Sequence, residues 1–273
     1  LQSSLSAAQC EGLKGFYLWK KEKSYETAIA HFKKAVAIYQ QKGGPNSNYL
    51  PPVYVNMGGC YNDAGDSRKS LDLYHSALEN FLAQDEALAN LTGRAEAHPH
   101  LLSVYNNLGK SHGDLGEFAL AIQYLKEAVK ISPRGRYWNN LGNAYMQKGE
   151  MRDAEKCFRA ALDDFLKQKK LDSAEVARPY HNLGVILRGM GNIDSALIYE
   201  FTSLPYRKSE GFFTLDVART YAGIGECYAI LKKHQTAIAY FDTALWIQHH
   251  KMPSGQHPEI AAAFLSKSEN LFL

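Results

Sequence analysis

Asparagine stands two residues before a glycine at four places in this chain of 273 residues: Asn56, Asn107, Asn140 and Asn182. Asparagine is a mediocre helix former, because its amide competes for local backbone hydrogen bonds, so this recurrence requires a reason. A carboxamide donates and accepts hydrogen bonds, as a peptide group does. A row of such amides would hold the backbone of an extended peptide. The alternative is that each amide bonds to a neighbouring helix.

Arginine stands six residues before a glycine at Arg136, Arg178 and Arg219. Three guanidinium groups at equivalent places would form a positive stripe for carboxylate or phosphate groups, and Lys110 would extend it. The alternative is that these arginines pair with acids from adjacent loops, and surface pairs of that kind contribute only about 0 to 1 kcal/mol. The nearby acids are Asp172, Glu175 and Asp216.

More polar residues recur near the same glycines and complete the candidate peptide-binding set: Asn106, Asn139, Asn143 and His181, with Asn62 and Asp114 beyond them. The residue types that carry catalysis or bind metals form no such pattern. Cys10, Cys60, Cys157 and Cys227 lack a Cys-x-x-Cys pair, and none of the ten histidines has metal-ligand spacing on one helix face. We therefore expect no enzymatic activity, no metal and no cofactor.

The segments that position these side chains repeat along the chain. Five glycines each follow an aromatic residue by four positions and precede small residues by twelve and nineteen positions: Gly58, Gly109, Gly142, Gly184 and Gly225. An aromatic residue or leucine lies between the two small residues, with Glu200 as the exception. An earlier unit keeps Ala28, Phe32 and Ala35 but carries Phe16 where the glycine is expected. The small residues are where antiparallel helices approach closely.

This pattern resembles the tetratricopeptide repeat over nearly the whole chain. The resemblance implies an all-α fold, a right-handed superhelical solenoid of helix-turn-helix repeats whose first helices line a concave groove. Gly65, Gly116, Gly149 and Gly191 are expected to end first helices in the left-handed conformation. Units of about 42 residues with His-Pro before the first helix, as at His98-Pro99, resemble the kinesin light chain type of repeat.

We expect one solenoid over residues 1–273. Its repeats are predicted at residues 9–50, 51–101, 102–134, 135–176, 177–217 and 218–260, and residues 261–273 would form a capping helix or a truncated seventh repeat. The resemblance places the asparagines and arginines named above on the groove. It disfavours a chaperone-tail receptor, because the two-carboxylate clamp of that branch requires a lysine where this chain has Asn106, Asn139 and His181.

Charge and hydropathy limit the classes of partner. A net charge of +3 from 31 basic and 28 acidic residues is too small to predict nucleic-acid binding. No run of apolar residues approaches the roughly 18 that a membrane span requires. Unpaired cysteines fit a cytoplasmic location.

We therefore predict a non-enzymatic interaction scaffold that binds a protein or peptide segment, with acidic groups selected by the arginines. The kinesin light chain type of repeat also occurs in bacterial signalling proteins, and the missing initiator Met suggests a fragment. We therefore keep as an alternative the regulatory sensor region of a larger signalling protein, such as a CHAT-type caspase-like protease, whose effector domain is absent from this chain. Self-association through the end helices is a third hypothesis.

Overall fold

The computed structural model describes residues 2–44, 47–92, 100–168, 173–209 and 211–251, and every described element is helical. The predicted all-α class is therefore confirmed. The chain forms two compact units, residues 1–133 and 134–273, which we call unit 1 and unit 2. A single solenoid over both units remains a prediction, and the predicted cap at residues 261–273 lies outside the described residues.

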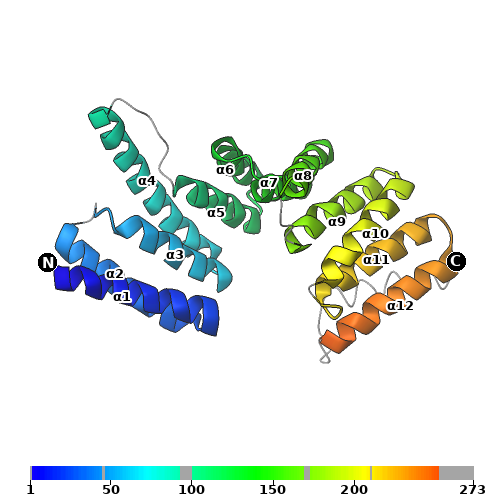
Figure 1. Cartoon of the computed structure of the whole chain (residues 1–273), viewed down its shortest axis with the longest axis horizontal. Helices are drawn as coiled ribbons and strands as arrows, with labels where there is room; N and C mark the ends of the chain where they lie inside the picture. Colours follow the sequence, from blue (N-terminus) through cyan, green and yellow to red (C-terminus); the bar gives the residue numbers. More distant parts are fainter. Residues whose placement is uncertain (1, 45–46, 93–99, 169–172, 210, 252–273) are drawn as a thin grey trace. The chain divides into compact units, whose positions relative to one another are not determined.

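Unit 1 contains three helix pairs (Figure 1). Its elements are α1 (Gln2–Tyr17) with the π-helical turn η1 (Leu18–Glu22), α2 (Tyr25–Gly43), α3 (Leu50–Asp63), α4 (Ser67–Thr92), α5 (Leu101–Asp114) and α6 (Phe118–Ile131). Each helix packs most extensively on the other member of its pair, and within the unit α2 packs on α3 and α4 on α5 to join successive pairs. This neighbour-by-neighbour packing is that of a repeat protein.

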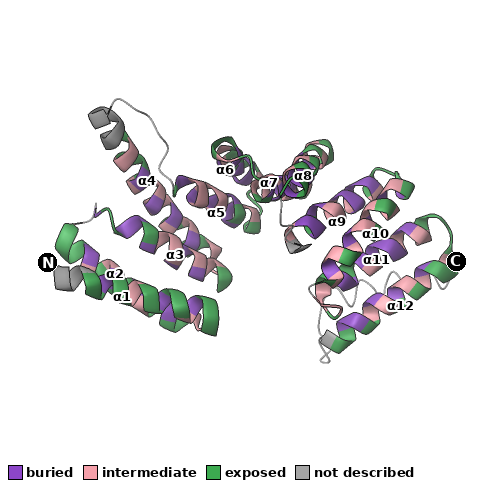
Figure 2. Ribbon diagram, viewed as in Figure 1, coloured by how far each residue is buried: buried purple, intermediate pink, exposed green. Residues whose placement is uncertain are grey.

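Unit 2 contains three more pairs. Its elements are α7 (Gly135–Lys148), α8 (Met151–Leu166), α9 (Ser173–Gly189), α10 (Ile193–Lys208), α11 (Leu215–Ile230) and α12 (His234–Lys251). In both units the buried residues follow the faces where neighbouring helices meet (Figure 2). The predicted repeat starts match helices α3, α5 and α7 within one residue, whereas α1, α9 and α11 begin three to seven residues earlier than predicted.

Each repeat brings a glycine of its first helix against a large side chain of its second. A Cβ on Gly142 would lie 2.7 Å from the ring of Phe158, and a Cβ on Gly58 would lie 2.7 Å from the ring of Tyr74. Phe158 is completely buried. The glycine and the large residue therefore form one packing unit, in which the missing side chain makes room for the ring.

The first repeat contains this glycine one residue earlier than the sequence frame predicts. Gly15, and not Phe16, faces Phe32, since a Cβ on Gly15 would lie 3.0 Å from the Phe32 ring. Ala28 follows Gly15 by thirteen positions, whereas in the other repeats the small residue of the second helix follows the glycine by twelve positions. Because a π-helical turn accommodates one additional residue, η1 absorbs the extra position. The expectation that this repeat lacks its glycine was wrong for this reason.

The turns inside the repeats confirm a second prediction. Gly65, Gly116, Gly149 and Gly191 all adopt φ between +77° and +88°, one or two residues after the first helix of their repeats. In the first and sixth repeats the same left-handed position holds a lysine, Lys23 with φ of 55° and Lys232 with φ of 58°. These two turns carry the strain of a side chain at positive φ.

The cysteines differ sharply in exposure, and this makes a test of the packing. Cys60, Cys157 and Cys227 are buried and Cys10 is exposed. Burial raises the pKa of Cys60 to about 11 and also raises the pKa of Cys227. Since the thiolate is the reactive form, a chromogenic disulfide reagent at pH 8 is expected to titrate one thiol rapidly and the others only after unfolding. Cys10→Ser should remove the fast phase, and two or more fast thiols would contradict the packing.

Candidate functional site

The predicted amide row is only partly available for binding. Asn56, Asn107, Asn140 and Asn182 are each half-buried. Asn182 Nδ2 on α9 donates to Asn143 Oδ1 on α7 at 2.9 Å, so this pair joins neighbouring helices, as the alternative to a peptide-binding row requires. Asn107 Oδ1 accepts from Asn106 Nδ2 at 3.4 Å.

Asn139 differs from the rest of the predicted set, because only 5% of its surface is exposed and its Oδ1 atom has no hydrogen-bond partner among the described residues. A residue enclosed in this way is not part of a binding surface, and we leave it out of the candidate site.

The three predicted arginines, by contrast, are all exposed on the first helices of unit 2. The Arg136 guanidinium lies 5.6 Å from the centre of the Tyr137 ring. Arg219 Nη1 lies 2.8 Å from Asp216 Oδ1, one of the acids named as an alternative partner. Among the described residues, no carboxylate forms an ion pair with Arg136 or Arg178. Of the three arginines, only Arg219 therefore has a carboxylate partner among the described residues.

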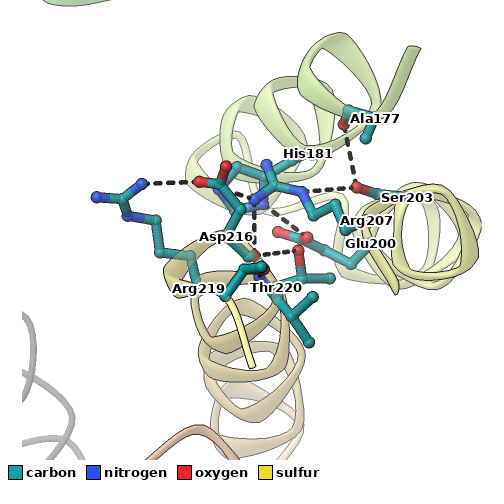
Figure 3. Close-up of polar contacts among 10 residues, drawn as sticks. Ala177, His181, Glu200, Ser203, Arg207, Asp216, Arg219 and Thr220 are labelled. Atoms are coloured by element: carbon teal, nitrogen blue, oxygen red, sulfur yellow. Dashed lines mark hydrogen bonds and ion pairs between the residues drawn. The ribbon is translucent and has the colours of Figure 1, made fainter. Parts of the chain in front are cut away.

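A second feature of unit 2 is a buried polar cluster at the junction of α9, α10 and α11, which the sequence pattern did not predict (Figure 3). We call it the Glu200 cluster. Glu200 is completely buried, and its Oε2 atom accepts a hydrogen bond from His181 Nδ1 at 2.8 Å. Arg188 Nη1 lies 3.7 Å from Glu200 Oε1, and Arg188 Nη2 lies 2.5 Å from Glu226 Oε2 on α11.

Glycines make the space for this carboxylate. A Cβ on Gly223 of α11 would lie 2.5 Å from Glu200 Oε1, and a Cβ on Gly184 would lie 2.9 Å from the Glu200 side chain. Glu200 therefore occupies the place of the aromatic residue or leucine in the other repeats. Its contacts with α9 continue through Arg188 to Glu226 on α11, so charged groups link the three helices. The sequence signal was present, since Glu200 was the one exception at its position, but its partners could not be read from spacing.

Arg207 continues the polar layer next to the exposed arginines. It is 6% exposed, its Nη1 atom donates to the backbone carbonyl of Asp216 at 2.6 Å, and its Nε atom donates to Ser203 Oγ at 3.2 Å. Burial lowers the pKa of Arg207 from its ordinary value, the charge of Asp216 opposes this, and the charges of Arg219 and Arg178 lower it further. Asp216 is shared between the guanidinium groups of Arg207 and Arg219, at 3.3 and 2.8 Å from its Oδ1 atom (Figure 3). The positive charges of Arg178 and Arg219 thus both act on Arg207.

In unit 1, Lys110 and Asn107 line a pocket of about 190 Å³. Lys110 is exposed on α5. The other lining residues come from η1, α3 and α4: Trp19, Lys20, Gly59, Asn62, Asp63 and Tyr74. The pocket thus joins elements of three successive repeats, and its lining is polar.

No described helix is both long and apolar enough to cross a bilayer. In the part of the chain that the structure describes, no three potential ligands among His, Cys, Asp and Glu come together in a way that could bind a metal ion.

Comparison with known proteins finds relatives by sequence. The human cell division cycle protein 16 homolog is 26% identical over 150 residues, which are 55% of this chain and 23% of that protein. The kinesin light chain-related protein 2 of Arabidopsis thaliana is 20% identical over 246 residues, which are 86% of this chain and 36% of that protein. The chain therefore spans less than half the length of both relatives.

Solved structures show the same fold. The Cut9 and Hcn1 hetero-tetramer of the APC/C superposes with a TM-score of 0.70 at 20% identity, covering 97% of this chain and 43% of the compared chain. BtubC (BKLC) from P. vanneervenii superposes with a TM-score of 0.61 at 21% identity, covering 94% of this chain and 93% of the other.

One family model of the tetratricopeptide repeat matches residues 7–83 and 134–208. A second model of the repeat matches residues 102–134 and 218–247. The matched residues include the glycine and large-residue pairs of all six repeats. The chain belongs to the tetratricopeptide repeat family.

Proposed function

We propose that this protein is a non-enzymatic scaffold that binds an extended, acidic segment of a partner protein along the first helices of its repeats. The observation that carries this proposal is the row of exposed arginines in unit 2, with Arg136 on α7, Arg178 on α9 and Arg219 on α11. Guanidinium groups recognise carboxylates through paired hydrogen bonds of fixed geometry. An acidic segment would offset their mutual repulsion.

Two further features support the proposal. The Glu200 cluster and Arg207 form a buried polar layer at α9, α10 and α11, next to Arg178 and Arg219. Positive charges fixed on a rigid support lose little side-chain entropy when a ligand binds. Within each unit the half-buried amides are proposed to hold the backbone of a bound segment, Asn56 and Asn107 in unit 1 and Asn140 and Asn182 in unit 2, with Asn182 already paired to Asn143.

The proposal also draws on the relatives. One similar structure is a complex of the APC/C subunits Cut9 and Hcn1, and a sequence relative is related to kinesin light chain. The first of these is a hetero-tetramer, and so an assembly of proteins. This supports the binding of another protein as the general role, and the exposed arginines support an acidic segment as the ligand.

The test is a selection from a displayed library of random twelve-residue peptides with the full chain as bait. We expect the selected peptides to be enriched in Asp and Glu. Arg178→Glu should then weaken the binding of a selected peptide by about tenfold or more, because it removes a charged hydrogen bond and adds a like charge. Fluorescence anisotropy with the labelled peptide measures this.

Arg152→Glu is the matched control, because Arg152 is exposed on α8, the second helix of its repeat. It makes the same charge change in unit 2 and should alter affinity by less than about threefold, the residual effect of long-range charge. The melting temperatures of both variants should match that of the parent chain. Selected peptides without excess acidic residues, or equal losses in the two variants, would refute the proposal.

A further inference from the structure

The pocket of unit 1 has a fixed wall, which the η1 turn supplies. Trp19 is 6% exposed, and its indole Nε1 donates to Asp63 Oδ2 on α3 at 2.8 Å. Gly59 permits this position, since a Cβ there would lie 2.5 Å from the Trp19 ring. The additional residue that η1 absorbs therefore places an aromatic ring against the next repeat. Insertions of this kind in helices occur frequently at functional sites.

Two ammonium groups line the pocket. Lys20 Nζ lies 3.3 Å from the centre of the Trp19 ring and 3.9 Å from Asp63 Oδ2, with 42% of its side chain exposed. Lys110 comes from α5 and forms no ion pair with any described residue. Burial is the main cause that lowers the pKa of Lys20, and repulsion from Lys23 and Lys110 lowers it further against the attraction of Asp63.

The other polar groups in the pocket divide into occupied and available. Asn62 is occupied, because its Nδ2 atom donates to Asp114 and its Oδ1 atom accepts from Ser67 and Ser111. Asn107 uses its Oδ1 atom to accept from Asn106, and its Nδ2 donor forms no hydrogen bond with the described residues. The donors that line the pocket are on Lys20, Lys110 and Asn107. The acidic group of the lining is the carboxylate of Asp63, whose Oδ2 atom accepts from Trp19 and lies 3.9 Å from Lys20 Nζ.

We propose that this pocket binds the carboxylate of a single aspartate or glutamate side chain from the partner segment, between Lys20 and Lys110. The inference rests on the proposed function, because it takes the ligand to be a protein segment. Two ammonium charges and the one carboxylate of Asp63 leave a net charge of +1 in the lining. A monoanion neutralises that charge and relieves the repulsion between the lysines, while Asn107 Nδ2 supplies a further hydrogen bond.

The test follows the indole N–H signal of Trp19 by NMR in the full, ¹⁵N-labelled chain. The chain has three tryptophans, and Trp19→Phe assigns the signal. The probe is the blocked tripeptide acetyl-Ala-Glu-Ala-amide, and the comparison is the same peptide with Gln. We expect a saturable shift with the Glu peptide and an affinity about tenfold weaker with the Gln peptide, the loss of a charged hydrogen bond.

Variants of Lys110 test the role of its charge in binding. Because Lys110 is exposed, its replacement should not disturb the fold. Lys110→Gln should weaken the Glu peptide about tenfold, and Lys110→Arg, which keeps the charge, should retain affinity within about threefold. Lys130→Gln is the matched control, since Lys130 is an exposed lysine of α6 that pairs with Glu127 at 3.7 Å. It should leave the affinity unchanged. Unaltered indole signals of Trp138 and Trp246 report that unit 2 is intact.

Equal affinity for the Glu and Gln peptides, or unchanged affinity in Lys110→Gln, would overturn the proposed carboxylate site. Tighter binding of a phosphoserine peptide than of the Glu peptide would also overturn it, because the pocket would then be a site for a dianion. Failure of the pocket is distinguishable from failure of the proposed function. The Trp19 signal reports unit 1 alone, whereas the Arg178→Glu test measures unit 2. If the Trp19 indole signal does not shift with the Glu peptide while Arg178→Glu weakens binding of the selected peptide, the pocket proposal is wrong and the proposed scaffold function stands.

Discussion

Replacing Glu200 with alanine is expected to lower the free energy of unfolding by about 3 to 5 kcal/mol, the cost of breaking a buried ion pair from one side. The carboxylate is completely buried between His181 and Arg188. Its removal leaves the Arg188 guanidinium, with only 16% of its side chain exposed, facing an empty space beside Gly184 and Gly223. Urea denaturation followed by circular dichroism at pH 7 measures the change.

The matched control for this variant is Glu155→Ala on α8. Glu155 forms an ion pair with Arg159 one helical turn away at 2.7 Å, and 55% of the Arg159 side chain is exposed. Its loss should cost at most about 1 kcal/mol, because solvent screens surface pairs. A cost for Glu200→Ala no larger than that of the control would show that the buried carboxylate contributes little.

A double-mutant cycle sharpens the result. Once Arg188 is alanine, removing Glu200 should cost less than it does in the parent chain, because no guanidinium is left facing the empty space. Additive costs would mean that the two side chains do not interact across their 3.7 Å separation.

Phe158→Ala is expected to lower the free energy of unfolding by a similar amount, about 3 to 5 kcal/mol for a buried phenylalanine. Its ring is completely buried and packs on Gly142 of the preceding helix. The loss combines the transfer of the ring to water with a cavity that the rigid helix pair cannot close. Thermal and urea unfolding of the variant and the parent chain measure the difference.

Phe201→Ala provides the control of equal chemistry, because this phenylalanine of α10 is 40% exposed. It should cost about 1 kcal/mol or less. The reciprocal change Gly142→Ala would force a methyl group against the Phe158 ring and should cost about 1 to 3 kcal/mol. Equal losses for Phe158→Ala and Phe201→Ala would show that the glycine and ring pair does not support the repeat.

Much of the fold could be predicted from the sequence, because the signals act locally. The glycine that ends a first helix needs positive φ, and the pairing of a small with a large residue recurs at fixed spacing within a repeat, as in Gly142 and Phe158. The first repeat was the exception. A frame with constant spacing put Phe16 in the glycine position, since the one-residue insertion in η1 is visible only when the helices pack.

The candidate site was predicted less well. The exposed arginines lie on the expected helices, while Asn139 is enclosed and Asn182 bonds to Asn143. A repeat frame gives the position of a residue within its helix, but small differences in helix rotation and in neighbouring side chains decide whether that position is open. Both the function of the arginines and that of the amides therefore remain proposals.

The sequence by itself determined the helical class, the repeats and the starts of α3, α5 and α7, because these depend on periodicity and on residues a few positions apart. Only the tertiary structure decided which charges meet. It enclosed Glu200 between two helices of different repeats, and it brought Lys20 to the same pocket as Lys110, ninety residues later in the chain. The physical reason is that contacts between repeats join side chains from distant segments of the chain. Burial of a charged group also strengthens its electrostatic interactions, and neighbours in the sequence do not reveal that burial.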